Sequence, residues 1–130
     1  MGPALRAVLD TSVLIAEDLP PLEGELAISA ASLAELHFGV LITADADVRA
    51  ERLRRLTSIQ SRFDALPIDD AVATSYGQLA AAAVATRRKP RSRVMDLLIA
   101  ATAHAYGARL YTRNAADLTG LENLVEIVSV

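Results

Sequence analysis

Four acidic residues spread along the chain have the type and placement that metal-assisted chemistry needs: Asp10, Glu35, Asp96 and Asp117. Carboxylates that gather in one place raise each other's pKa values unless a cation neutralises them. Mg²⁺ and Mn²⁺ are hard cations that prefer such oxygen ligands. A bound ion of this kind activates water and stabilises a leaving oxygen at phosphorus. If the four side chains meet, we therefore expect a divalent-metal site that hydrolyses phosphodiester bonds.

Two of the acids stand beside apolar runs. Asp10 ends the run Ala7–Leu9, which indicates a buried strand followed by a polar turn and a helix. The alternative role of Asp10 is to cap that helix. Asp96 interrupts the apolar segment 94–101, where a buried charge needs a cation or several hydrogen-bond donors. Its alternatives are a solvent-facing position or an ion pair with an arginine.

The other two acids also have structural alternatives. Ser32 followed by Glu35 matches a capping box, in which Glu35 would bind a backbone amide. Glu35 also follows a predicted strand by a few residues, so it can equally lie at the edge of the sheet. Asp117 belongs to a turn in which Thr112 and Asn114 can hydrogen-bond neighbouring ligands, although Asn and Asp are ordinary turn residues.

Strands and helices alternate along the chain, and this order must position the acids. Apolar runs predict strands over residues 5–10, 26–29, 66–68, 108–112 and 124–130. Helical spacing and capping residues predict helices over 11–16, from Ser32 through Leu41, over 46–62, from Asp69 or Asp70 to about Ala85, and from Ser92 to Gly107, with a short helix within 114–118. We predict an α/β fold, with a central, mainly parallel sheet flanked by helices. Three of the acids would follow strands and meet at the carboxyl edge, where such sheets bind ligands.

Composition limits the other classes of site. A chain of 130 residues makes one domain, residues 1–130, and its apolar content of 52% leaves room for a subunit interface. The chain has no cysteine and two scattered histidines, which exclude zinc–thiolate and His-rich sites. A net charge of −3 argues against a protein coated in positive charge, but a local basic patch is enough to bind nucleic acid. We expect no targeting segment, no membrane span and a cytoplasmic location.

A basic segment precedes the predicted helix that carries Asp96. Its five positive residues are Arg87, Arg88, Lys89, Arg91 and Arg93. They can steer RNA phosphates, or a protein partner, toward an acidic site that would otherwise repel RNA. The alternative is a solvated loop between helices. Arg113, beside Asn114, is placed to hold the phosphate that is cleaved.

At these residues the sequence resembles the PIN-domain family and, within it, the VapC-type ribonuclease toxins. Four segments carry the resemblance in order: residues 9–15 (LDTSVLI), 32–36 (SLAEL), 95–103 (MDLLIAATA) and 112–118 (TRNAADL). Each segment alone is weakly specific, whereas the ordered set is highly specific and covers nearly the whole chain.

The resemblance implies a small α/β/α fold and a Mg²⁺- or Mn²⁺-dependent endoribonuclease that acts as the toxin of a toxin–antitoxin pair. It implies that Asp10, Glu35, Asp96 and Asp117 form the catalytic, metal-binding site. It also implies accessory roles for Asn114, near the variable fourth acid, and for Thr11, Ser12 and Thr112, which would orient carboxylates or water. The implied partners are RNA, a second copy of the chain in a homodimer, and a VapB-like antitoxin that blocks the site in a higher assembly.

Two other functions compete with the nuclease. One is a non-catalytic PIN-like module that only binds RNA or a protein. The other is a receiver-like signalling domain, which needs paired acids after the first strand and a lysine late in the chain. Only Asp10 follows the first predicted strand, and no lysine follows Lys89, so the receiver-like interpretation is disfavoured.

Overall fold

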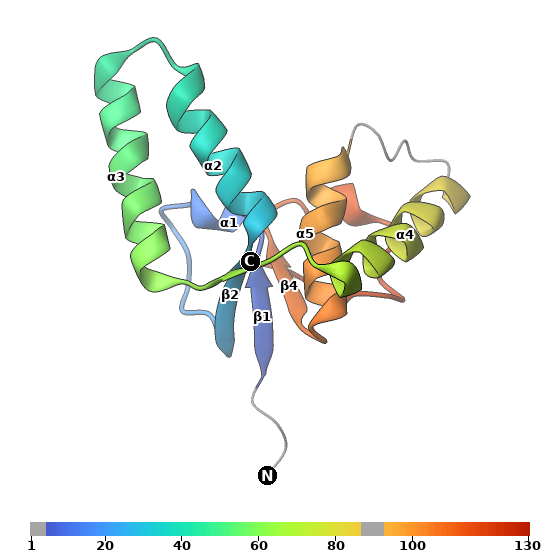
Figure 1. Cartoon of the computed structure of the whole chain (residues 1–130). Coiled ribbons are helices and arrows are strands. Elements are labelled where there is room, and N and C mark those ends of the chain that lie inside the picture. The colour runs from blue at the N-terminus through green and yellow to red at the C-terminus, as the bar shows by residue number, and fades with distance from the viewer. Residues whose placement is uncertain (1–4, 87–92) are drawn as a thin grey trace.

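A computed structural model of the chain describes residues 5–86 and 93–130, which form a five-stranded, all-parallel sheet (Figure 1). The strands are β1 (Arg6–Leu9), β2 (Glu25–Ser29), β3 (Ala65–Leu66), β4 (Arg109–Thr112) and β5 (Ile127–Ser129). Their order in the sheet is β3-β2-β1-β4-β5, and each neighbouring pair is parallel. The predicted α/β fold with a parallel sheet is therefore confirmed.

Helices connect the strands. They are α1 (Thr11–Leu14), α2 (Ala30–Ile42), α3 (Ala46–Arg62), α4 (Asp70–Ala85), α5 (Val94–Ala105) and the 3₁₀ helix η2 (Ala115–Leu118). The prediction for residues 46–62 is confirmed at both ends. The Asp45 carboxylate caps the start of α3 by accepting from the amides of Asp47 and Val48. Asp69 caps α4 in the same way, through the Val72 amide at 3.0 Å. Both caps use an aspartate immediately before the helix, which is a local signal.

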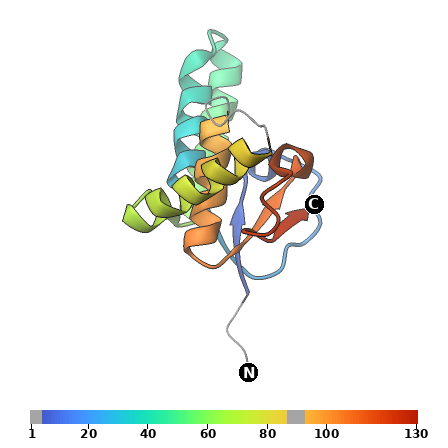
Figure 2. The same cartoon turned by 90° about the vertical axis from the view of Figure 1, so that its right-hand side faces the viewer.

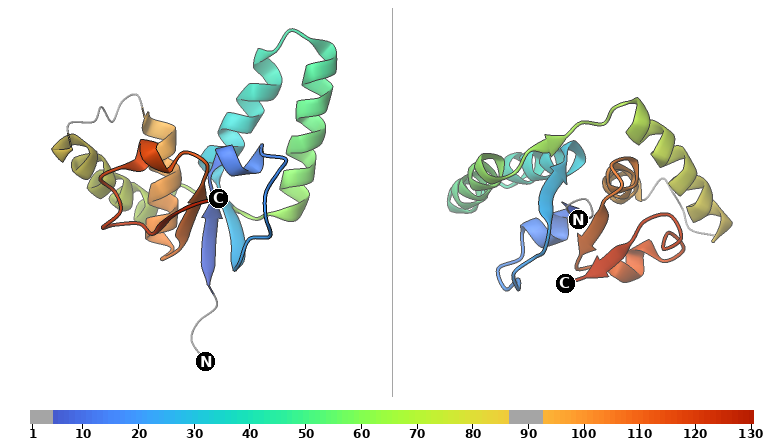
Figure 3. Two further views of the ribbon diagram at one scale, coloured as in Figure 1. Left: turned by 180° about the vertical axis from the view of Figure 1, so that it is seen from behind. Right: turned by 90° about the horizontal axis from the view of Figure 1, so that it is seen from below.

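The sheet has an apolar core on each face. Val8 of β1 packs into the core that α4 and α5 cover, whereas Ala7 and Leu9 belong to the core on the other face, with Val13 of α1. This alternation follows from the two-residue period of a strand. Figures 2 and 3 show α4 and α5 on one side of the sheet and α1 on the opposite side. The central strand is thus buried on both faces, as parallel sheets require.

Some predicted boundaries differ from the structure. The helix expected to open at Ser32 begins at Ala30, and Ser29 caps it by accepting from the Ala31 amide at 3.1 Å. The strand expected over 124–130 is limited to β5, because the chain before it turns back through bonds such as Val125 N–H to Leu121 O at 3.0 Å. The predicted start of α5 at Ser92 lies outside the described residues.

Glycine ends α5 as the sequence predicted. Gly107 has φ of +64°, the left-handed conformation that glycine adopts readily. The Ala108 amide donates to Ala103 O at 2.8 Å and the Gly107 amide to His104 O at 3.2 Å, the two bonds of a Schellman motif. The chain then enters β4 directly, so α5 and β4 are joined by a short, defined turn.

The helices α2 and α3 form a hairpin that projects beyond the sheet (Figure 1). Three large apolar side chains of α2 are mainly exposed: Phe38, Leu41 and Ile42. Their spacing of three and four residues places them on one side of the helix. No helix among the described residues is long and apolar enough to cross a membrane.

Candidate metal centre

The carboxyl ends of β1 and β4 lie side by side at one edge of the sheet. Leu9 of β1 pairs with Tyr111 of β4, and the Asp10 amide donates to Tyr111 O at 2.9 Å. Asp10 and Thr112 each follow one of these paired residues. The parallel register therefore places Asp10 and Thr112 next to each other at the carboxyl ends of the two strands.

Three of the four predicted acids share a small cavity at this edge. Asp10 after β1, Asp96 in the first turn of α5 and Asp117 of η2 line it together with Asn114. The cavity measures about 10 Å³, close to the space of one water-sized sphere. Asp10 and Asp96, which are 86 positions apart in sequence, thus line the same cavity.

Hydroxyl groups fix the Asp10 carboxylate. Its Oδ2 accepts from Thr112 Oγ1 at 2.7 Å and from Ser12 Oγ at 3.0 Å, and the Asp10 residue is 8% exposed. The Asn114 amide donates to Thr112 Oγ1 at 2.9 Å, and the Arg113 amide donates to Ser12 Oγ at 3.1 Å. Asp10 occupies the N-cap position of α1 but its side chain makes no capping hydrogen bond. The capping alternative for this carboxylate is therefore wrong.

Glu35 of α2 is bound by a side chain from α1. Thr11 Oγ1 donates to Glu35 Oε1 at 2.7 Å and lies 3.0 Å from Ser32 Oγ. The capping box is therefore wrong, because Ser32 stands inside the helix and Glu35 faces Thr11 instead of the helix's first amide. Glu35 does not line the small cavity, but its charge acts on Asp96. Ser32 is fully buried and takes part in this hydroxyl network, although the sequence suggested only a capping role for it.

The pKa of Asp96 is raised above its ordinary value. Partial burial is the largest cause, and the negative charges of Asp10 and Glu35 come next. Arg93 lowers this pKa, but by less than those three causes raise it, and Asp117 raises it further. The site therefore holds carboxylates close enough to repel one another, which is the electrostatic condition that a bound cation relieves.

Arg93 stands between two of these acids. One guanidinium nitrogen, Nη1, lies 3.8 Å from Asp96 Oδ2 and 3.4 Å from Asp117 Oδ1. The alternative for Asp96, an ion pair with an arginine, is thus present within the cluster. The other four basic residues of the segment, Arg87, Arg88, Lys89 and Arg91, lie outside the described residues.

The guanidinium of Arg113, which we expected to hold a phosphate, is paired with a loop acid. Arg113 Nη2 lies 2.8 Å from Asp18 Oδ1 and 3.4 Å from the Asp18 carbonyl oxygen. Asp18 is mainly exposed, so solvent screens this ion pair. Sequence reasoning missed Asp18, because no local pattern links a residue of the 16–24 loop to one that is 95 positions away.

The carboxylate oxygens of the site are the ligands that a hard divalent cation prefers, but the side chains do not converge on one point. In residues 5–86 and 93–130, no three acidic or histidine side chains are close enough to hold one ion as they stand. The fit rests on oxygen donors around an ion-sized cavity and on the mutual repulsion that raises the pKa of Asp96. Asp10 Oδ1 accepts no hydrogen bond from the described part of the chain, so that oxygen is available as a ligand.

A serine–histidine pair, which the sequence did not suggest, lies away from the acids. Ser75 Oγ of α4 is 2.7 Å from His104 Nδ1 near the end of α5, whereas Asp96 lies in the first turn of that helix. Ser75 is buried, so it is not exposed to a substrate. This pair joins α4 to α5 and does not belong to the candidate metal centre.

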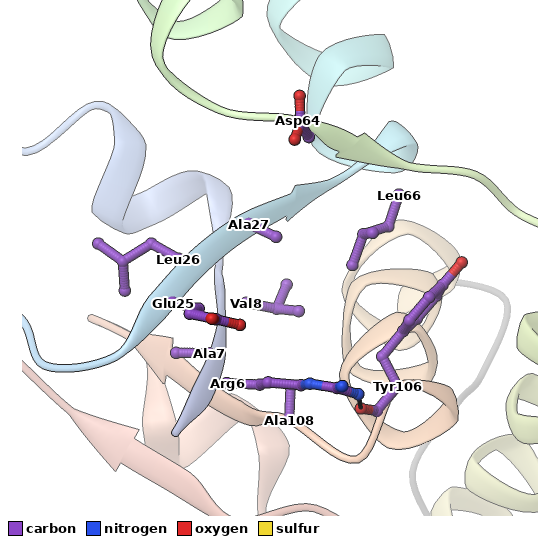
Figure 4. Close-up of a pocket in the computed structure, with 10 residues that line it drawn as sticks. All are labelled: Arg6, Ala7, Val8, Glu25, Leu26, Ala27, Asp64, Leu66, Tyr106 and Ala108. Atoms are coloured by element: carbon purple, nitrogen blue, oxygen red, sulfur yellow. Dashed lines mark hydrogen bonds between the residues drawn. The ribbon is translucent and has the colours of Figure 1, made fainter. Parts of the chain in front are cut away.

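A roomier pocket of about 560 Å³ lies near the amino ends of β1 and β2 (Figure 4). Arg6 points across it and donates to the Tyr106 carbonyl oxygen at 3.4 Å, and Glu25 lies close by. Parallel sheets bind ligands beyond the carboxyl ends of their strands. The position of this pocket at the other end separates it from the acidic cavity.

The chain belongs to the PIN-domain family, since the family model of the PIN domain matches residues 7–116. It is 36% identical to Ribonuclease VapC5 of Mycobacterium tuberculosis (strain ATCC 25618 / H37Rv) over 131 residues, which cover 95% of this chain and 94% of that protein. It is 34% identical to Ribonuclease VapC4 of the same strain, over 96% of this chain and 97% of the relative.

Solved structures show the same fold. A crystal structure of VapBC-5 from Mycobacterium tuberculosis, a member of the VapBC family of toxin–antitoxin systems, matches with a TM-score of 0.80 and 33% identity over 96% of this chain and 97% of that one. FitAcB from Neisseria gonorrhoeae matches with a TM-score of 0.73 and 26% identity over 93% and 95%. The fold predicted from the four motifs is therefore confirmed.

Proposed function

We propose that this protein is a Mg²⁺- or Mn²⁺-dependent endoribonuclease and the toxin of a toxin–antitoxin pair. The observation that carries the proposal is the common cavity of Asp10, Asp96 and Asp117 at the carboxyl edge of a PIN-domain sheet. The relatives named ribonucleases match this chain over nearly the full length of both proteins, which supports the reaction. The VapBC toxin–antitoxin structures support the biological role.

The residues divide the work as follows. Asp10 and Asp96 would hold the metal, and Glu35 and Asp117 would complete the charge or bind a second ion. A bound divalent ion supplies the acidity that activates water and stabilises the leaving oxygen. Thr112 and Ser12 keep Asp10 oriented, and Thr11 orients Glu35. A carboxylate of the cluster would accept the proton of the attacking water.

Basic residues would bind the phosphate backbone. Arg113 is bound to the exposed acid Asp18 through a screened ion pair, so an RNA phosphate can replace that acid. A chain with net charge −3 needs such local cations to approach RNA. We propose that the segment from Arg87 to Arg93 contributes to the same task or to antitoxin binding.

The partners follow from the relatives. We propose that a VapB-like antitoxin covers the site, that the protein forms a homodimer within the higher assembly, and that it acts in the cytoplasm. The exposed apolar side chains of α2 support a protein partner, because single domains seldom leave several large apolar residues together in water.

The proposal is tested with purified protein, a structured RNA and Mn²⁺. We expect the wild-type chain to cleave, and Asp96→Asn to lower the rate by about 100-fold or more, because a metal ligand charge is lost. The matched control is Asp47→Asn, which neutralises a first-turn aspartate of α3, away from the cavity. It should cleave like the wild type, and circular dichroism should show both variants folded.

Two results would contradict the enzyme. Equal cleavage by Asp96→Asn and the wild type would mean that a contaminant cuts the RNA. Absence of cleavage by folded wild-type protein with either Mg²⁺ or Mn²⁺, together with retained RNA binding, would favour the non-catalytic module.

A further inference from the structure

Arg93 occupies an unusual place for a basic residue, in the middle of a carboxylate cluster. It directly precedes α5, and its Nη1 lies within 4 Å of both Asp96 and Asp117. These are two of the three acids that line the small cavity. A guanidinium has no acceptor and cannot cap the amides at a helix N-terminus, and the Arg93 side chain contacts the two acids instead.

The two ion pairs are loose. Charge-assisted hydrogen bonds between a guanidinium and a carboxylate measure about 2.7–2.9 Å, whereas these separations are 3.8 and 3.4 Å. The side chains of Arg93, Asp96 and Asp117 are 31%, 42% and 50% exposed. Ion pairs this exposed contribute little to stability. The guanidinium therefore interacts with the acids mainly through charge attraction and not through short hydrogen bonds, so another cation can replace it.

We propose that the Arg93 guanidinium is an internal counter-ion of the acidic site, which a divalent cation must displace from between Asp96 and Asp117. This inference rests on the proposed metal-dependent function. A small dication binds carboxylate oxygens at roughly 2.0–2.1 Å, so an ion held by Asp96 Oδ2 and Asp117 Oδ1 would lie close to the guanidinium nitrogen that now contacts both oxygens. The two cations also repel each other.

The arrangement of the site agrees with this exchange. With Arg93 in place, no three acids of the described chain converge on one point. Asp96 and Asp117 line the cavity with Asp10 and also lie within 4 Å of the Arg93 guanidinium, so an ion that joins the three carboxylates competes with Arg93 for two of them. Metal binding therefore includes the work of breaking both pairs, and Arg93 sets the metal concentration at which the site fills.

The test is a Mn²⁺ titration of the metal-free full chain, with free Mn²⁺ measured by electron paramagnetic resonance at constant ionic strength. Arg93→Gln keeps a polar side chain and removes the charge. We expect it to bind Mn²⁺ about three- to tenfold more tightly than the wild type, the range for losing two exposed ion pairs. Arg93→Lys keeps the charge and should stay close to the wild type.

The matched control is Arg109→Gln. Arg109 is also a partly buried arginine in an ion pair, 3.3 Å from Glu126, but at the opposite end of β4 from the site. Its replacement changes the net charge equally, so an unchanged Mn²⁺ affinity would show that the effect of Arg93 is local. A second measurement is the rise in melting temperature on adding Mn²⁺, which should be larger for Arg93→Gln than for the wild type.

The outcomes separate the inference from the proposed function. If wild-type protein binds Mn²⁺ and folded Arg93→Gln binds it equally or more weakly, Arg93 does not compete with the metal and the inference is wrong. Weaker binding would mean that Arg93 instead holds the carboxylates ready for the ion. If neither protein binds millimolar Mn²⁺, the metal site itself fails, and the proposed function fails with it.

Discussion

The Asp10 carboxylate is oriented by hydroxyl groups that are themselves tied to the backbone. Thr112 donates to Asp10 and accepts from the Asn114 amide, and Ser12 donates to Asp10 and accepts from the Arg113 amide. Each hydroxyl thus joins the end of β1 to the turn after β4. Thr112 is fully buried, which makes it a positioning residue whose loss water cannot easily repair.

We expect Thr112→Val to weaken both the fold and the reaction. The change keeps the shape but removes a donor to Asp10 and the acceptor of the Asn114 amide. Urea unfolding should show a loss of about 1–3 kcal/mol, and cleavage should fall by roughly 10–100-fold. Thr119→Val, at an exposed hydroxyl that donates to Ala116 O, should stay within about 0.5 kcal/mol of the wild type. Normal cleavage by Thr112→Val would remove Thr112 from the site.

The raised pKa of Asp96 predicts how metal-free stability depends on pH. Because the pKa is higher in the folded chain than in the unfolded chain, the ionised carboxylate opposes folding. This opposition is absent below the unfolded pKa, and it is complete once the pH exceeds the folded pKa. At pH 7 with a chelator, Asp96→Asn should therefore melt at the same or a higher temperature than the wild type, with the difference shrinking in acid.

A second first-turn aspartate supplies the contrast. Asp47 of α3 also stands in the first turn of a helix but does not line the acidic cavity, so Asp47→Asn should lose about 0.3–1 kcal/mol of stability at pH 7. Thermal melts of the two variants should therefore move in opposite directions. A large loss in metal-free Asp96→Asn would mark Asp96 as a structural residue instead of a site residue.

At the scale of elements, local signals predicted what local contacts determine. Asp45 and the amphipathic spacing of 46–62 define α3 from within its own sequence, and both ends were predicted correctly. The start of α2 was not, because Ser29 and Ser32 both match a helix-capping residue. The local cap of Ser29 on the Ala31 amide decides the start. The partner of Glu35 is Thr11, 24 positions away, and only the packing of α1 against α2 reveals this contact.

The end of α5 offers a test of backbone conformation alone. An added Cβ at Gly107 or at Gly39 would meet no atom within 4 Å, but only Gly107 has a positive φ. Gly107→Ala should therefore lose about 1–2 kcal/mol, whereas Gly39→Ala, inside α2, should gain about 0.5–1 kcal/mol. Urea unfolding measures both. An equal response of the two variants would contradict the Schellman end of α5.

At the scale of the molecule, the sheet order decides which predicted site residues meet. Parallel pairing of β1 with β4 follows from alternating strands and helices, so the meeting of Asp10 with Asp96 and Asp117 was predictable. The pairing of Arg113 with Asp18 was not, and neither was the placement of Arg93 between two acids. These contacts depend on long, flexible side chains that reach across segments distant in sequence.

The projecting α2–α3 hairpin predicts a variant that separates partner binding from catalysis. Leu41 is 74% exposed, so Leu41→Glu should keep the free energy of unfolding within about 0.5 kcal/mol of the wild type. RNA cleavage should also be unchanged, while copurification with the co-expressed cognate antitoxin should fall. Glu51→Gln, on the exposed surface of α3, is the control. Normal copurification of Leu41→Glu would place the antitoxin elsewhere.

The hydrogen bond from the Asp10 amide to Tyr111 O gives the site two unequal halves. That amide joins the end of the central strand β1 to β4, and Asp10 is buried, so its proton should exchange slowly with deuterium. The Asp117 amide bonds within one exposed 3₁₀ turn, to Asn114 O, and should exchange orders of magnitude faster through local fraying. Deuterium uptake measured by mass spectrometry would thus separate a rigidly held acid, Asp10, from a more mobile one, Asp117. Of these two acids, only Asp117 could then change its position to suit ions of different size.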